Sequence, residues 1–259
     1  MIELLDSHAH VDASAFEGET DEILRRAAEA GVTKILSIGQ WYAPGDFGGA
    51  IELAAAHPGR VFASIGIHPH EVANVPEGDW RELERLATLP ATVAVGETGL
   101  DYHYDHSPRE DQRRWFSHQL DLAARVKKPV IVHTREADDD TVAILREAGS
   151  SDGVIHCFTG DPARATVYLD MGLYLSIPGV VTFKNAEPLR DAVRMAPLER
   201  MLIETDCPYL APIPHRGKRN EPAYVRLVAE KIAELKGIDV EEVAATTTRN
   251  AVELFRLGR

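Results

Sequence analysis

The chain has 259 residues, 44% apolar and 27% charged, and shows no linker or low-complexity segment, so we expect residues 1–259 to form one domain. A formal net charge of −13 argues against a protein that coats nucleic acid nonspecifically, and two cysteines are too few for a disulfide framework. Because no apolar run could span a membrane and the first residues lack a signal-peptide pattern, we expect a cytoplasmic protein without membrane contact.

Strand-like apolar runs alternate with helical patterns along the whole chain. The predicted strands are 2–6, 34–38, 61–67, 92–96, 129–132, 153–155, 174–177 and 200–203. The predicted helices are 21–30, 49–56, 80–89, 109–126, 141–148, 163–171, 188–195, 221–235 and 241–254. Eight strands, each followed by a helix, predict an α/β protein with a (β/α)8 TIM barrel, whose site lies at the carboxyl ends of the strands.

The first strand-like run leads into two histidines that are one residue apart, His8 and His10. Residues two apart on an extended strand point to the same side, so both imidazoles can project together beside Asp6. Two imidazoles on one side can begin a metal site. Taken alone, the pair is also typical of surface or capping histidines.

Later strand ends add more residues of the metal-ligating types. Glu97, His133, His156 and Asp206 follow the fourth, fifth, sixth and eighth strands, which meet at one mouth in a barrel. With His8 and His10 these six side chains exceed the needs of one tetrahedral ion, so we expect two divalent ions (Zn²⁺, Mn²⁺ or Mg²⁺) bridged by Glu97. Any one histidine could instead be a buried structural group, but that alternative does not predict a shared location.

Seven segments resemble, in order, the motifs of TatD-type metal-dependent hydrolases. They are LDSHAHVD (5–12), GIHPH (66–70), GETGLDY (96–102), PVIVHTREA (129–137), HCFTG (156–160), ETDCPYL (204–210) and RGKRNEP (216–222). The resemblance implies an amidohydrolase-like barrel, two divalent ions and hydrolysis of DNA phosphodiester bonds. It further implies a deoxyribonuclease, active as a 3′-5′ exonuclease on single-stranded DNA or DNA ends. We infer no obligate protein partner from the sequence.

Two carboxylates are the candidates for catalysis. We expect Asp206 to bind one ion and to accept the proton of the attacking water, although a role as ligand alone fits equally well. Glu97 would act at the same centre as the bridging ligand. Glu204 could hold a further ion or orient a water, and the alternative is a buried carboxylate paired with a cation.

Side chains that can donate hydrogen bonds to phosphate are the candidates for holding the substrate. His68 and Arg135 are predicted to bind the scissile phosphate, Arg135 through its planar fork, unless it forms a structural ion pair. Arg216, Lys218 and Arg219 form a tight basic cluster that could contact the DNA backbone. The alternative for this cluster is a solvated loop held by acidic partners.

The loop 40–49 departs from the family pattern, because it carries the aromatic residues Trp41, Tyr42 and Phe47. They form either a stacking platform for an unpaired base or local packing against the barrel rim.

Two other functions use the same residues. One is an amidohydrolase-like enzyme that acts on a small amide, lactone or phosphoester. The absence of a lysine at the fourth or fifth strand end argues against members that use a carboxylated lysine. The other is a metal-binding interaction protein without catalytic activity.

Overall fold

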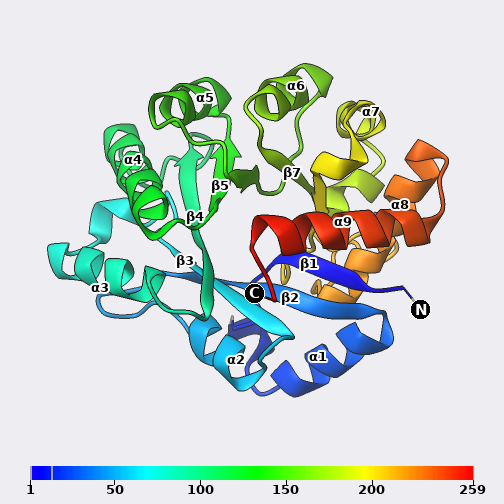
Figure 1. Ribbon diagram of the computed structural model, residues 1–259, viewed down its shortest axis with the longest axis horizontal. Helices are drawn as coiled ribbons and strands as arrows, with labels where there is room; N and C mark the ends of the chain where they lie inside the picture. Colours follow the sequence, from blue (N-terminus) through cyan, green and yellow to red (C-terminus); the bar gives the residue numbers. More distant parts are fainter. Residues whose placement is uncertain (1, 13, 259) are drawn as a thin grey trace.

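The computed structural model describes residues 2–12 and 14–258. Eight parallel strands form one sheet in which each strand pairs with the next along the chain, and helices surround it (Figure 1). The strands are β1 Leu4–Ala9, β2 Val32–Gln40, β3 Val61–Gly66, β4 Thr92–Asp101, β5 Val130–Arg135, β6 Gly153–Ile155, β7 Tyr174–Ile177 and β8 Met201–Ile203. The predicted (β/α)8 barrel is therefore confirmed.

The helices form the outer layer of the barrel. The α-helices are α1 Thr20–Glu29, α2 Ala50–Ala56, α3 Glu77–Ala87, α4 Arg109–Val126, α5 Asp138–Glu147, α6 Pro162–Asp170, α7 Glu187–Met195, α8 Val225–Lys236 and α9 Val240–Leu254. Short 3-10 turns span Ser14–Phe16, Val72–Asn74, Gly179–Thr182, Leu198–Arg200 and Pro222–Tyr224. The last of these replaces the first turn of the predicted helix 221–235.

The barrel closes between its first and last strands. The backbone N–H of Asp206 donates to the carbonyl of His8 at 2.9 Å. The Thr205 amide and hydroxyl donate to the Asp6 carboxyl group at 2.9 and 2.5 Å. These bonds bring the two ends of the barrel sheet into register at the point where the predicted ligands lie.

Asp6 serves this closure. Its side chain is fully buried, and both of its oxygens accept hydrogen bonds from Thr205. Burial raises the pKa of Asp6 to about 8, although the bonds from Thr205 oppose this shift. Asp6 lies in β1 and precedes the two histidines, and its side chain is engaged in joining β1 to β8.

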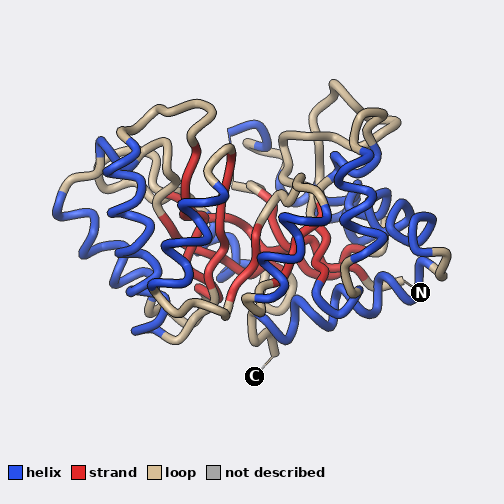
Figure 2. Tube along the Cα trace, turned by 90° about the horizontal axis from the view of Figure 1, so that it is seen from above, coloured by secondary structure: helices blue, strands red, loops and turns tan. Residues whose placement is uncertain are grey.

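The apolar core has two parts. The larger part lies between the strands and the helices, and the smaller part fills one end of the barrel interior. There Leu254 and Phe255, at the end of α9, pack with strand residues such as Leu36 and Ile131. Figure 1 shows α9 crossing this end, and Figure 2 shows long loops gathered at the opposite end. One end is thus closed by apolar side chains, and the other is left for polar chemistry.

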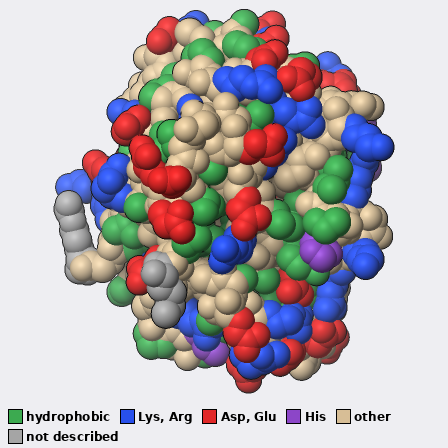
Figure 3. All heavy atoms as spheres, turned by 90° about the vertical axis from the view of Figure 1, so that its right-hand side faces the viewer, with side chains coloured by type: hydrophobic (Ala, Val, Ile, Leu, Met, Phe, Trp, Pro, Cys, Tyr) green, Lys and Arg blue, Asp and Glu red, His purple; other side chains and the backbone are tan. Residues whose placement is uncertain are grey.

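The surface of the barrel mixes charges of both signs. On the face that Figure 3 shows, Lys and Arg side chains are interspersed with Asp and Glu side chains. Across residues 2–12 and 14–258, none of the helices has both the length and the apolar character that crossing a membrane requires.

Two glycines allow a matched test of packing at element ends. Gly31 and Gly237 both have a positive φ, of 90° and 66°. A Cβ on Gly31 would lie 2.8 Å from the Ile2 carbonyl oxygen, whereas a Cβ on Gly237 would meet nothing within 4 Å. Alanine at either position costs roughly 1–2 kcal/mol for the left-handed backbone. Gly31→Ala should therefore lower the free energy of unfolding by about 1 kcal/mol more than Gly237→Ala, measured by urea denaturation. Equal losses would contradict the close contact.

Candidate metal centre

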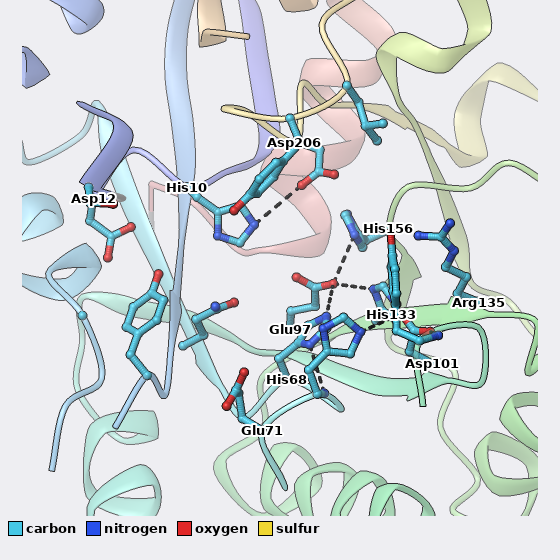
Figure 4. A pocket seen from close by; sticks show the side chains of 18 of the residues that line it. His10, Asp12, His68, Glu71, Glu97, Asp101, His133, Arg135, His156 and Asp206 are labelled. Atoms are coloured by element: carbon cyan, nitrogen blue, oxygen red, sulfur yellow. Dashed lines mark hydrogen bonds and ion pairs between the residues drawn. The ribbon is translucent and has the colours of Figure 1, made fainter. Parts of the chain in front are cut away.

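A cavity of about 770 Å³ lies at the carboxyl ends of the strands (Figure 4). The predicted ligands that line it are His10, Glu97, His133, His156 and Asp206. His8 is fully buried and its ring stacks on that of His156, with centroids 3.6 Å apart. The structure thus brings together side chains that are far apart in the sequence.

Glu97 lies at the middle of this cluster. It belongs to β4, which is longer than predicted, and it is 3% exposed. Its Oε2 lies 3.3 Å from Nε2 of His8. Its Oε1 lies 2.7 Å from Nδ1 of His133 and 3.2 Å from Nε2 of His156. The two oxygens of one carboxylate therefore face two different groups of histidines.

Asp206 completes the group around the first strand. Its Oδ1 lies 3.8 Å from Nε2 of His8 and 3.6 Å from Nε2 of His10. The ligand atoms of these three side chains all lie within 4.8 Å of one another, as do those of His8, Glu97 and His156. Because β8 ends at Ile203, Asp206 lies in the following loop, and it has a positive φ of 56°.

The donor set fits a divalent metal. Both ring nitrogens of His8 are buried without a hydrogen-bond partner, which is costly unless something else binds them. Burial opposes ionisation of Glu97, but the positive charge of the facing His156, together with hydrogen bonds from His133 and His156, outweighs burial and holds the pKa of this carboxyl well below its usual range. An ionised carboxylate among imidazoles is the ligand set that Zn²⁺ and Mn²⁺ accept.

A second layer of carboxylates orients the histidines. Oε1 of the fully buried Glu204 lies 3.1 Å from Nδ1 of His156 and accepts the Cys157 N–H at 2.7 Å. Oδ2 of Asp101 lies 3.2 Å from Nε2 of His133. In each histidine, one ring nitrogen faces Glu97 and the other faces an outer carboxylate, an arrangement that fixes ring orientation in metal sites.

The two outer carboxylates reach the histidines from different kinds of segment. Glu204 lies in the loop after β8, which ends at Ile203, and its side chain meets the far nitrogen of His156. Asp101 ends β4, stabilises its loop by accepting the N–H groups of His103 and Tyr104, and also contacts His133. The sequence held a signal for this second contact, since Asp101 lies four residues after Glu97.

The candidate phosphate ligands occupy the same cavity. Nε2 of His68 lies 3.5 Å from Oε1 of Glu97. Arg135 is exposed, lines the cavity and holds its guanidinium 4.6 Å from the centre of the Tyr104 ring. Within the described part of the chain Arg135 forms no ion pair with a carboxylate, so the structural ion pair considered from the sequence is not found.

The structure does not bring the basic cluster of the last loop to the cavity. Arg216, Lys218 and Arg219 are exposed but absent from its lining. Arg219 pairs with Glu19 at 2.6 Å, and Arg216 lies 4.5 Å from the centre of the Phe183 ring. They can meet a nucleic acid only outside the cavity.

In the loop 40–49, two of the aromatic side chains pack locally and one is available for stacking. Trp41 and Phe47 are buried, as local packing requires. Tyr42 is 42% exposed and lines the cavity. His70, to which the sequence assigned no role, also lines the cavity, and its Nε2 lies 2.8 Å from Oδ2 of Asp101.

A (β/α)8 barrel with histidines and carboxylates converging at the carboxyl ends of its strands defines a class of metal-dependent hydrolases. The family model described as TatD related DNase matches residues 5–256. The chain belongs to the TatD family, and it is a metal-dependent hydrolase of that family.

Individual relatives agree with this assignment. An Escherichia coli K12 protein called uncharacterized metal-dependent hydrolase YcfH is 47% identical, over 98% of this chain and 96% of that protein. A protein of Edwardsiella piscicida called 3′-5′ ssDNA/RNA exonuclease TatD is 36% identical, over 98% of this chain and 100% of that protein. The crystal structure of the E. coli K12 TatD homolog YJJV superposes with a TM-score of 0.89 at 29% identity, covering 98% of both chains.

The outer carboxylate Glu204 can be tested through metal affinity. Glu204→Gln keeps the shape of the side chain but removes the charge that faces His156. Loss of such a partner weakens metal binding by about 10- to 100-fold, which competition with a chromophoric chelator would measure. The exposed Glu187 supplies the matched control Glu187→Gln, which should bind metal as the parent does. Parent-like affinity in Glu204→Gln would contradict the orienting role, and loss of a whole equivalent of metal would make Glu204 a direct ligand.

Proposed function

We propose that this hydrolase cleaves phosphodiester bonds at the 3′ end of DNA, as a 3′-5′ exonuclease with two divalent ions bridged by Glu97. The observation that carries the proposal is the position of Glu97, whose two oxygens face separate histidine groups below the cavity. The name of the relative from E. piscicida supports a nucleic-acid substrate. The free thiols of Cys157 and Cys207 fit action in a reducing cytoplasm.

The ligands divide into two sets around Glu97. His8, His10 and Asp206 would hold one ion, and His133 and His156 would hold the other. Bound there, two divalent ions supply charge stabilisation for a phosphoryl group and make a water molecule more acidic.

Asp206 is the side chain placed to receive a proton. It lines the cavity, so the attacking water can reach it. Burial raises the pKa of this carboxyl, but the facing His10 and His156 outweigh burial and leave the pKa below its usual value. Asp206 is therefore a carboxylate at neutral pH and can accept the proton as the water attacks.

Arg135 and His68 would hold the phosphate in different ways. Arg135 can offer two parallel N–H groups to phosphate oxygens, and its contact with Tyr104 holds the guanidinium at the cavity wall. Burial lowers the pKa of His68 to about 4, so its imidazole is neutral and would contribute a hydrogen bond without a charge.

The cavity also favours a second candidate function. Its volume of about 770 Å³ is that of a small-molecule site, and Arg135 is the one Lys or Arg residue among its described lining. A small phosphoester, lactone or amide would fit the same centre. Membership in a hydrolase family leaves the non-catalytic alternative without support.

DNA digestion during metal titration tests the main proposal. Metal-free protein would receive Mg²⁺, Mn²⁺ or Zn²⁺ in steps, and 5′-labelled single- and double-stranded DNA would report the products. We expect a ladder that shortens from the 3′ end, with activity rising only after more than one equivalent of metal has bound. Asp206→Asn should reduce turnover by roughly 100-fold or more, because it removes the proton acceptor.

The controls separate this proposal from its alternatives. DNA left intact, together with rapid hydrolysis of a small phosphoester or lactone, would favour the second candidate. Full activity at one equivalent of metal would contradict the two-ion centre. Near-parental turnover of Asp206→Asn at saturating metal would rule out proton acceptance by Asp206.

Binding of DNA should depend only weakly on salt. Few phosphates are neutralised when Arg135 is the single cationic Lys or Arg residue in the described lining, and the salt dependence of affinity scales with the number of phosphate contacts. Arg135→Lys keeps the charge but loses the fork, so the single-turnover rate should fall by roughly 10-fold or more. Lys218→Ala, outside the cavity, is the matched control and should chiefly weaken binding of longer strands. A steep salt slope, or an unchanged rate in Arg135→Lys, would contradict this account.

A further inference from the structure

Exposed aromatic side chains gather at the cavity. Within residues 2–12 and 14–258, the exposed tyrosines are Tyr42, Tyr104 and Tyr209, whose exposed fractions are 42, 50 and 61%. All three line the cavity, and they come from the loops after β2, β4 and β8. Large aromatic rings usually lose most of their exposure on folding, so three exposed rings around one cavity indicate a binding surface.

Among the described residues, two of these rings already contact another ring or a guanidinium, and Tyr42 does not. Tyr104 carries the Arg135 guanidinium 4.6 Å from its ring centre and stacks on His106, with centroids 5.5 Å apart. Tyr209 meets the His10 ring edge to face at 6.1 Å. Within the described residues, Tyr42 has neither an aromatic ring nor a cation against its face.

The loop that carries Tyr42 is held in place before any ligand binds. The Trp41 indole N–H donates to Asp79 at 2.6 Å, and the Tyr42 N–H donates to the Asp46 carbonyl at 2.9 Å. Gly48 lies so close that a Cβ there would be 2.7 Å from the Tyr42 ring. A ring on a loop held in this way loses less conformational entropy when a flat group stacks on it than a ring on a free loop would.

The charges around the cavity indicate which part of a nucleic acid would reach Tyr42. Asp12 lies across the cavity from Arg135, Glu71 lies at the lower edge of the view (Figure 4), and Asp46 belongs to the Tyr42 loop. Apart from Arg135, the described lining contains no Lys or Arg. A continuing phosphate backbone would be repelled on this acidic side, whereas a base and a sugar hydroxyl carry no charge.

We propose that Tyr42 and the acidic side of the cavity form a subsite for the unpaired 3′-terminal nucleoside, whose base stacks on the Tyr42 ring. This inference rests on the proposed function and names the part of the substrate that enters the cavity. The 3′ hydroxyl points toward the carboxylates, and the phosphate to be cleaved lies toward Arg135. Paired ends must therefore fray before they are cleaved, and the identity of the base matters little, because every base has a flat face.

The first test compares ends with and without a base. Single-turnover cleavage would be measured on 5′-labelled single strands that end either in a normal nucleoside or in an abasic tetrahydrofuran residue. Stacking of one base on an aromatic ring changes affinity by roughly 5- to 150-fold. Tyr42→Leu, which keeps apolar bulk in the loop, should lower kcat/KM for normal ends about 10-fold and leave abasic ends within about twofold of the parent.

Two control variants accompany this test. Tyr42→Phe keeps the ring and should match the parent on both substrates. Met195→Ala changes an exposed side chain outside the cavity and should also match the parent. Equal losses on normal and abasic ends in Tyr42→Leu would overturn the proposal, because a general disturbance of the loop does not discriminate between the two ends.

A second substrate tests the acidic side of the cavity. A strand with a 3′-terminal phosphate should be cleaved at least about 10-fold more slowly than the same strand with a 3′ hydroxyl, and equal rates would overturn the assignment of the acidic side.

A binding measurement separates failure of this inference from failure of the proposed function. Calorimetry would compare deoxyadenosine 5′-monophosphate with deoxyribose 5-phosphate, which lacks the base, on the metal-loaded protein. The parent should bind the nucleotide about 10-fold more tightly, and Tyr42→Leu should bind the two ligands equally. If this preference holds while DNA is not cleaved, the base subsite stands and the exonuclease proposal fails. If DNA is cleaved but Tyr42→Leu leaves the preference unchanged, the subsite is wrong.

Discussion

Closure of the barrel between β1 and β8 is the constraint that positions the metal-ligating side chains at the carboxyl ends of the strands. The Asp206 N–H bonds to the carbonyl of His8, and Thr205 bonds to Asp6 across 199 residues of sequence. These short contacts fix the distance between the histidines of the first strand and the carboxylate after the last one. A shift of one residue in this register would separate the two halves of the ligand set, because alternate strand residues face opposite sides.

A buried carboxylate sets the electrostatics of the site. Glu97 has almost no contact with solvent, and burial alone would keep it protonated. The imidazoles around it reverse that preference, and Glu204 and Asp101 in turn compensate the outer nitrogens of two of those imidazoles. Carboxylates and imidazoles thus alternate in this centre. Removal of one of them leaves the neighbouring side chain buried without a partner of opposite charge.

The sequence predicted the barrel well because each strand is a short apolar run followed by a helical pattern. It also brought Glu97 and His133 to the same cavity, although both lie within the longer strands β4 and β5 rather than after their ends. The orientation of Glu204 could not be predicted, because it depends on where β8 stops and the loop begins. Likewise, nothing in the loop 40–49 distinguishes Tyr42 from its buried neighbour Trp41, since their environments depend on residues such as Asp79 from a later segment.

The order in which the elements occur along the chain affects when the centre can form during synthesis. His8 and His10 are made early, whereas β8 and α9, which complete the sheet and cover its apolar end, come last among the described elements. An unfinished chain on the ribosome therefore exposes imidazoles without the carboxylate that completes their group. Hydrolytic activity is withheld from the nascent protein until almost all of the barrel has been made.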